Sequence, residues 1–143
     1  VSWGWESDNP SHSQFLDYHQ YQGTNDISTY LTVPKAISFL NQYNWKDIRD
    51  YCHNQIIETR KILIQTVGTE PICNDEDLGQ MTSLIINVND ADKLYRFLKS
   101  NNIEVPVFSW NGLSLLRVSF QCYNSMNDIA ILDKFLSKFL NGN

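Results

Sequence analysis

The dipeptide Asn111-Gly112 lies between two apolar runs and constrains the fold of this chain more than any other feature. Asn-Gly readily adopts the two positive-φ conformations of a type I′ turn, so it is the strongest short-range indication of a β-hairpin. After the turn, Leu116 and Val118 alternate with polar residues. This period of two predicts a strand with one buried face, and it places Arg117 on the opposite face.

Helical periodicity dominates much of the remaining chain. Asn44 and Asp47 form a capping-box-like pair ahead of the longest expected helix, whose apolar residues recur at helical spacing up to a stop at Gly68. Other helices are expected over residues 34–43, from a cap at Asn89 to about residue 100, and from a cap at Ser125 to the end of the chain.

The segment before these helices is interpreted as irregular. Residues 1–26 are polar and aromatic without a clear period, which is typical of a loop. Pro34 lacks a backbone N–H and is best tolerated at the first helical position, so a short turn is expected over residues 26–32. Aromatic side chains such as Phe15 and Tyr18 are too numerous for a solvated loop, and we expect apolar surface to be exposed in this region.

These elements, together with a strand expected over residues 82–88, indicate the fold class. We expect an α/β domain of the α+β sandwich kind, in which a small three- to four-stranded, mostly antiparallel sheet is covered by helices. The length of 143 residues fits one domain of ordinary size.

The charge and hydropathy of the chain exclude two classes of partner. With 11 basic and 16 acidic residues the net charge is −5, so the chain lacks the basic footprint of a nucleic-acid-binding protein. No apolar run approaches the length that spans a membrane, so no membrane partner is expected. The start at Val1, without an initiator Met or a signal peptide, indicates a fragment or a processed chain.

The three cysteines are widely spaced and form no C-x-x-C pair. This pattern argues against a disulfide framework and favours a reducing, cytoplasmic setting. Cys52 and Cys122 are expected in the core as small apolar residues. The three histidines, His12, His19 and His53, are scattered, so no metal site is expected from them.

Arg117 is the candidate functional residue that the pattern itself provides. If its face of the strand is covered only by solvent, the side chain is an ordinary surface residue. If the face lines a cleft, the planar guanidinium suits a carboxylate or a phosphate. No nucleophile motif, zinc-protease motif or phosphate-binding loop occurs in the chain.

Several segments, in order along the chain, match the motifs of one known family. They are residues 23–40 (GTNDISTYLTVPKAISFL), 79–81 (GQM), 103–107 (IEVPV), 110–112 (WNG) and 116–124 (LRVSFQCYN). Together they resemble the isopenicillin N epimerase-like branch of the class V aminotransferases, which are pyridoxal-phosphate (PLP) enzymes.

The resemblance implies a domain organisation and a quaternary state. The chain would be the C-terminal portion of a fold type I enzyme that is a homodimer with active sites at the subunit interface. Residues 1–33 would be a loop or interface segment belonging to the large domain or the dimer interface. Residues 34–68 would be linking helices, and residues 69–143 the C-terminal small α/β domain.

The resemblance also assigns roles to individual residues. Gly23 and Thr24 would contact the phosphate of PLP bound to the neighbouring subunit. Arg117 would bind the α-carboxylate of a small amino-acid-like substrate. Tyr123 and Asn124 match the same motif, but we interpret them as shaping the turn after the strand, with Asn124 near a helix N-cap.

Two departures from the family pattern limit these expectations. Asn25 stands where the branch usually has Arg, which puts contacts at that position in doubt. None of the seven lysines follows a His, so the Schiff-base lysine would lie in the missing N-terminal large domain. We therefore expect no catalytic residue in this chain, and we expect the chain alone to be inactive.

Two functions from different classes stay open at this point. The first is a PLP enzyme acting on an amino acid or small peptide as an epimerase, a cysteine desulfurase or a C–S lyase. The second is a stand-alone α/β binding module that uses Arg117 to hold an acidic metabolite or partner. The reading frame upstream of Val1 distinguishes them, because the enzyme requires about two hundred or more further residues.

Overall fold

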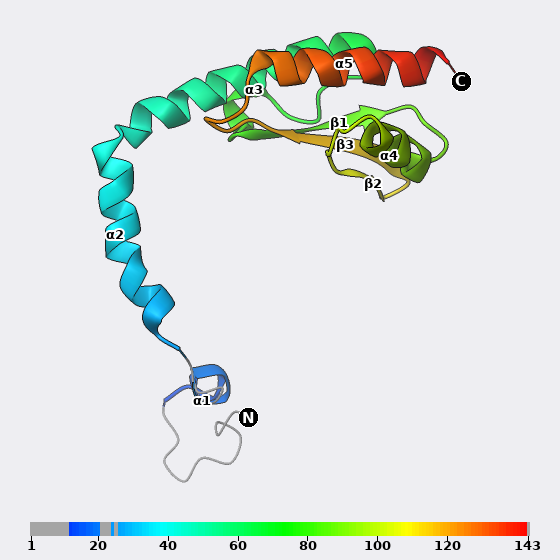
Figure 1. The fold of residues 1–143 in the computed structure, drawn as a ribbon. Helices are drawn as coiled ribbons and strands as arrows, with labels where there is room; N and C mark the ends of the chain where they lie inside the picture. The colour runs from blue at the N-terminus through cyan, green and yellow to red at the C-terminus, as the bar shows by residue number, and fades with distance from the viewer. Residues whose placement is uncertain (1–11, 21–23, 25, 143) are drawn as a thin grey trace. The chain divides into compact units, whose positions relative to one another are not determined.

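The computed structural model describes residues 12–20, 24 and 26–142, and it divides into two compact units, Val1–Tyr43 and Asn44–Asn143. The first unit contains α1 (Gln14–Gln20) and α2 (Ser28–Gln42). The second contains α3 (Trp45–Val67), a 3-10 turn (Asp75–Asp77), β1 (Met81–Ile86), α4 (Ala91–Ser100), β2 (Val107–Trp110), β3 (Leu113–Ser119) and α5 (Met126–Asn141), as Figure 1 shows.

The three strands form an antiparallel sheet in the order β1-β3-β2. The predicted hairpin joins β2 to β3, with Trp110 opposite Leu113. Asn111 and Gly112 have φ values of 48° and 77°, the left-handed pair that the type I′ turn requires. The sheet of three antiparallel strands covered by helices confirms the fold class expected from the sequence.

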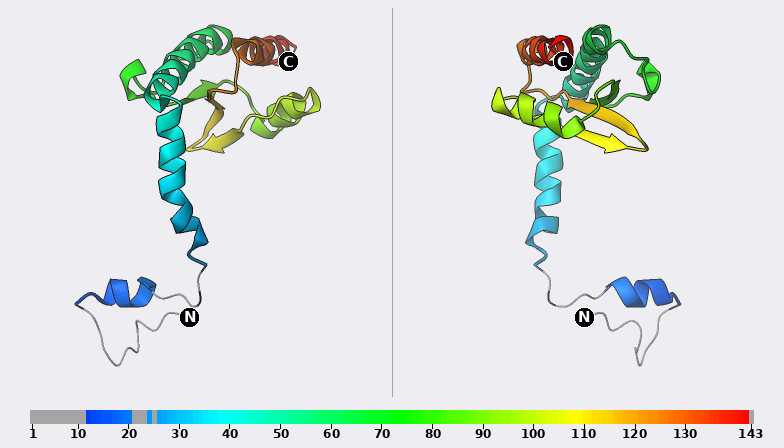
Figure 2. Two further views of the ribbon diagram at one scale, coloured as in Figure 1. Left: turned by 60° about the vertical axis from the view of Figure 1, so that its left-hand side comes forward. Right: turned by 90° about the vertical axis from the view of Figure 1, so that its right-hand side faces the viewer.

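Helices α3 and α5 lie side by side on one face of the sheet (Figures 1 and 2). The strands turn Leu84, Leu116 and Val118 toward these helices, and all three side chains are buried. Helix α4 contacts β2 and α5 and adds Leu94 and Leu98 to the same core. One continuous core therefore joins every helix and strand of the second unit.

Helix α3 buries the apolar stripe that its sequence predicts. Cys52, Ile56 and Leu63 are fully buried at helical spacing. The helix ends at Gly68, which has a φ of 66° in the left-handed conformation that glycine adopts without strain. At its start, the Asn44 side-chain amide donates to the Asp47 carboxylate at 2.5 Å, so the expected pair forms through side chains rather than as a backbone capping box.

The prediction for the first unit is wrong in two places. Residues 14–20, expected as loop, form α1, and the short turn expected over residues 26–32 is the beginning of α2. Helix α2 starts at Ser28 and continues through Pro34. It tolerates this proline because every residue of α2 is at least partly exposed, so water can hydrate the carbonyl that the missing N–H leaves unpaired.

Two smaller predictions for the second unit are also wrong. Asp90 rather than Asn89 caps α4, because its Oδ1 accepts a hydrogen bond of 2.9 Å from the backbone N of Lys93. Cys122 is exposed rather than buried. The alternation of β3 ends at Phe120, which is the last buried residue before the turn, so the chain has left the core before it reaches Cys122.

Candidate functional site

Arg117 lies in β3 between the buried residues Leu116 and Val118, and it is exposed on the opposite face of the sheet. In the antiparallel register it faces Ser83 of β1. On its other side its backbone N donates a 3.0 Å hydrogen bond to the carbonyl of Pro106. The position of the side chain is therefore fixed by strand pairing on both edges.

The guanidinium of Arg117 lies over an aromatic ring. Its Cζ is 5.9 Å from the ring centroid of Phe108 on β2, which is a cation–π distance. Sequence analysis did not name Phe108, although the signal was present. The Asn-Gly turn pairs Phe108 with Leu115, which makes Phe108 the diagonal neighbour of Arg117.

Arg117 differs from the other arginines in its partners. Arg49, Arg60 and Arg96 each lie within 4.0 Å of an aspartate oxygen. Among the described residues, Arg117 has no carboxylate within that distance, although the chain carries a net charge of −5. Its donors are therefore free to bind an anion from outside the described chain.

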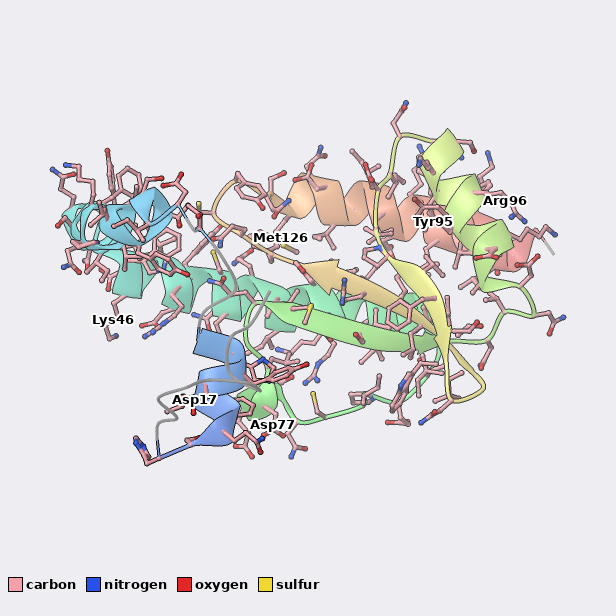
Figure 3. The ribbon with its side chains drawn as sticks, turned by 90° about the horizontal axis from the view of Figure 1, so that it is seen from below. Asp17, Lys46, Asp77, Tyr95, Arg96 and Met126 are labelled. Atoms are coloured by element: carbon pink, nitrogen blue, oxygen red, sulfur yellow. The ribbon has the colours of Figure 1, made fainter. Side chains whose placement is uncertain are left out.

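Arg117 lines a groove of about 420 Å³. One wall is the segment from Asn102 to Pro106, which leads into β2. The other wall is formed by the turn after β3, with Tyr123 and Asn124, and by the first turns of α5. Figure 3 labels Met126, the residue at which α5 begins. The groove is lined by one cationic group, Arg117, by two carboxylates, Glu104 and Asp128, and by apolar side chains. Neither carboxylate lies within 4.0 Å of the guanidinium, so a small carboxylate could pair with Arg117 at its own end of the groove.

Hydrogen bonds fix the turn beside the groove. Asn124 Oδ1 accepts a bond of 2.9 Å from the backbone N of Gln121, and the Asn124 N donates to the Gln121 carbonyl at 2.8 Å. Ser125 then begins α5 by donating its backbone N to Asp128 Oδ2 at 2.8 Å. These bonds agree with the structural interpretation of Asn124, whereas Tyr123 projects into solvent with 82% of its surface exposed.

The two residues expected to contact the cofactor belong to the first unit. Gly23 lies outside the described residues, as does Asn25. Thr24 is exposed, and no hydrogen bond of its hydroxyl is found among the described residues. Two residues later, the Asp26 carboxylate accepts bonds from the Ser28 backbone N at 2.9 Å and from its hydroxyl at 2.8 Å. These bonds lower the pKa of Asp26 and fix the entry of the chain into α2.

His53 borders a second cavity that sequence analysis did not predict. Its Nδ1 lies 3.1 Å from the Gly79 carbonyl, in a cavity of about 460 Å³ that Arg49, Asp50 and Gln80 also line. The residues 79–81 carry one of the family-like motifs, and the contact with His53 fixes the start of β1 against α3.

The described part of the chain has neither a candidate metal cluster nor a candidate membrane-spanning helix. No group of three or more His, Cys, Asp or Glu side chains is arranged to hold a metal ion there. No helix within residues 12–20 or 26–142 is long and apolar enough to cross a membrane.

Comparison with known proteins shows similarity to individual enzymes but to no family model. No family model matches the chain. Isopenicillin N epimerase from Amycolatopsis lactamdurans is 28% identical over 151 residues, an alignment that covers 96% of this chain and 38% of the epimerase. The chain thus spans less than half of the relative that it matches over almost its whole length.

A solved structure gives independent support. The 8-amino-7-oxononanoate synthase from Francisella tularensis superimposes on 74% of this chain with a TM-score of 0.59 and 25% sequence identity. The match covers 31% of the synthase chain. Both comparisons relate this chain to part of a larger PLP-dependent enzyme of fold type I. The chain is therefore a distant homologue of isopenicillin N epimerase, as its motifs indicate, and shares its fold with part of a fold type I PLP enzyme.

Proposed function

We propose that this chain is the C-terminal portion of a PLP-dependent enzyme of the class V aminotransferase family that acts at the α-carbon of an amino acid or small peptide. Within this class, epimerisation, cysteine desulfuration and C–S cleavage all stay open as the reaction. The part of the enzyme in this chain supplies that carboxylate site and a contact to the cofactor phosphate.

The observation that carries the proposal is the position of the Arg117 guanidinium. It lines the groove, and among the described residues no carboxylate oxygen lies within 4.0 Å of it. The Phe108 ring lies 5.9 Å from the Arg117 Cζ, at the outer limit of a cation–π contact. A bidentate pair with a substrate carboxylate in this groove contributes about 2–4 kcal/mol to substrate capture.

For the cofactor, the proposal assigns the contact to Gly23 and Thr24. The exposed hydroxyl of Thr24, with no partner of its own among the described residues, can donate to a phosphate oxygen, and so can its backbone N–H. PLP, when bound, withdraws electrons from the substrate α-carbon. The lysine that anchors it is assigned to the part of the protein outside this chain.

The proposal includes a homodimer and an N-terminal large domain that completes the site. Its support is the apolar surface of α2, where Tyr30, Leu31 and Ile37 are 65%, 71% and 53% exposed. Side chains of this kind are normally covered in a finished assembly. The cytoplasmic location stays a prediction from the cysteine pattern.

A stand-alone binding module is the second candidate, since the Arg117 groove would also hold an acidic metabolite without any cofactor. The two candidates differ in the covalent binding of PLP. We expect the complete protein to bind PLP in a form that borohydride reduction fixes to one lysine. We expect the 143-residue chain alone to bind PLP weakly or not at all.

The experiment is PLP titration of both proteins, followed by reduction and peptide mapping of the labelled lysine. Labelling of a lysine outside this chain in the complete protein supports the enzyme. A stoichiometric, saturable adduct on one of the seven lysines of this chain contradicts the assignment, and so does a complete protein without a PLP-reactive lysine.

A further inference from the structure

Cys52 of α3 and Cys122 of the turn after β3 meet at the same side chain. The Cys52 Sγ donates to Gln121 Oε1 at 3.6 Å, and the backbone N of Cys122 donates to the same oxygen at 2.8 Å. The two cysteines are 70 positions apart in the sequence, so only the fold brings them together. Neither the Arg117 groove nor the cofactor contact uses either thiol.

The shared contact with Gln121 limits how far apart the two cysteines can lie. The separation of Cys52 Sγ from the backbone N of Cys122 cannot exceed the combined length of the two hydrogen bonds to Gln121. A disulfide requires Cα atoms about 4.4–6.8 Å apart. Cys122 lies in a turn outside the three strands, so a backbone movement that brings the two Cα atoms to this distance breaks no strand pairing. Burial, and to a lesser degree the neighbouring Cys122 thiol, raises the pKa of the Cys52 thiol.

The two thiols differ in access. Cys122 is exposed, whereas Cys52 is completely buried. The third cysteine, Cys73, is exposed elsewhere, with its Sγ 3.7 Å from the Arg60 guanidinium. An accessible thiol with a second cysteine close by is the arrangement in which an oxidant reacts at the first and the second resolves the product.

We propose that Cys52 and Cys122 form a reversible thiol–disulfide site, with Cys122 as the reacting thiol and Cys52 as the resolving thiol. The oxidant class is a small-molecule disulfide such as oxidised glutathione. This site is independent of the proposed PLP function.

The reaction balances in two exchange steps. The Cys122 thiolate attacks one sulfur of oxidised glutathione, the S–S bond of the oxidant breaks, and one glutathione thiolate leaves. The Cys52 sulfur, after losing its proton, then attacks the Cys122 sulfur of the mixed disulfide and releases the second glutathione thiolate. The two leaving thiolates take up the two protons, so two protein thiols are oxidised and one glutathione disulfide is reduced to two thiols.

The modification has a structural consequence at the turn. A disulfide removes the S–H of Cys52, so the Gln121 side chain loses the hydrogen bond that it now accepts from this thiol. Gln121 is also linked to Asn124, which lines the groove: its backbone N donates to Asn124 Oδ1, and its carbonyl accepts from the Asn124 backbone N. Oxidation therefore alters the environment of the Asn124 amide.

The test treats the full chain with excess oxidised glutathione and identifies linked peptides by mass spectrometry without reduction. We expect a Cys52–Cys122 peptide in most molecules, reversed by dithiothreitol, with a shift of the Asn124 amide resonance. Cys73→Ser is the matched control and should retain the cross-link. Cys52→Ala should stop at glutathione bound to Cys122, and Cys122→Ser should lose the cross-link altogether.

Two results would overturn the proposal. One is a wild-type chain that carries only glutathione on Cys122 and forms no internal cross-link. The other is a cross-link that joins Cys73 to either of the remaining cysteines. Because the readout is a covalent bond, both results are independent of whether the protein binds PLP or an amino acid.

Discussion

Helices α2 and α3 follow each other in the sequence, yet they differ in what covers their apolar residues. Helix α3 buries Cys52, Ile56 and Leu63 completely beneath the sheet and α5. Helix α2 is also rich in apolar residues, but none of its side chains is buried. Residues such as Leu31 and Ile37 expose more than half of their surface.

The difference shows that residues 44–142 supply their own core, whereas the first unit builds none around the apolar residues of α2. Burial of an aliphatic side chain contributes about 1.5–3 kcal/mol, and α2 gains almost none of this.

The largest expected effect comes from matched isoleucines in the two helices. Ile56→Ala in α3 should lower the free energy of unfolding by about 2–5 kcal/mol, because it leaves a cavity at a fully buried site. Ile37→Ala in α2, at a site that is 53% exposed, should change it by less than about 0.5 kcal/mol. Urea unfolding of the 143-residue chain measures both, and equal losses would break the comparison.

Hydrogen exchange should show a similar contrast without mutation. The central amides of α3 open only with the core, whereas those of α2 open locally. We expect exchange in α3 to be slower by about two orders of magnitude or more. Protection of α2 equal to that of α3 would show that the chain covers α2 by itself.

Arg60 on α3 anchors the segment that follows this helix, and its substitution tests how much that contact stabilises the second unit. Its buried guanidinium donates to the Cys73 carbonyl at 2.6 Å and pairs with Asp75, which ties the segment after α3 back to that helix. Arg60→Met should lower the free energy of unfolding by about 1–3 kcal/mol. Arg96→Met, on the exposed face of α4 (Figure 3), should lower it by less than about 0.5 kcal/mol. Equal effects of the two variants in urea unfolding would contradict the anchoring role.

The smallest effect on folding is expected from Leu31→Lys in α2. Because the side chain is 71% exposed, the free energy of unfolding should stay within about 0.5 kcal/mol of the wild type. The same change should reduce self-association of the isolated chain in sedimentation measurements, since it places a charge in the exposed apolar surface. A wild-type chain that is already a monodisperse monomer would contradict the expectation that the apolar surface of α2 drives self-association.

Sequence reasoning predicted the elements whose local pattern and tertiary environment agree. The Asn111-Gly112 hairpin, the stripe of α3 and the outward position of Arg117 all follow from periodicity and turn chemistry. It failed for α2, because Pro34 was interpreted as a helix start whereas an exposed helix can continue through it. It also failed for Cys122, because no local pattern shows where a strand leaves the core.

The candidate site was predictable only in part. The strand alternation identifies Arg117, and the hairpin register could have identified Phe108 beneath it. The wall from Asn102 to Pro106 is irregular and has no period, so its position beside Arg117 depends on long-range packing. The contact of Gln121 with Cys52 joins distant segments and has no local signal at all.

The carboxylate site at Arg117 is tested most directly by steady-state kinetics of the complete protein on the amino acid that it converts fastest. Arg117→Ala should lower kcat/KM by about two orders of magnitude, because about 1.4 kcal/mol of lost binding corresponds to each tenfold. Arg117→Lys should recover only part of the loss, since the ammonium cannot form the bidentate pair. Arg96→Ala, which removes a surface arginine already near Asp90, should leave kcat/KM unchanged. A near-normal kcat/KM for Arg117→Ala would contradict the account and make Arg117 an ordinary surface residue.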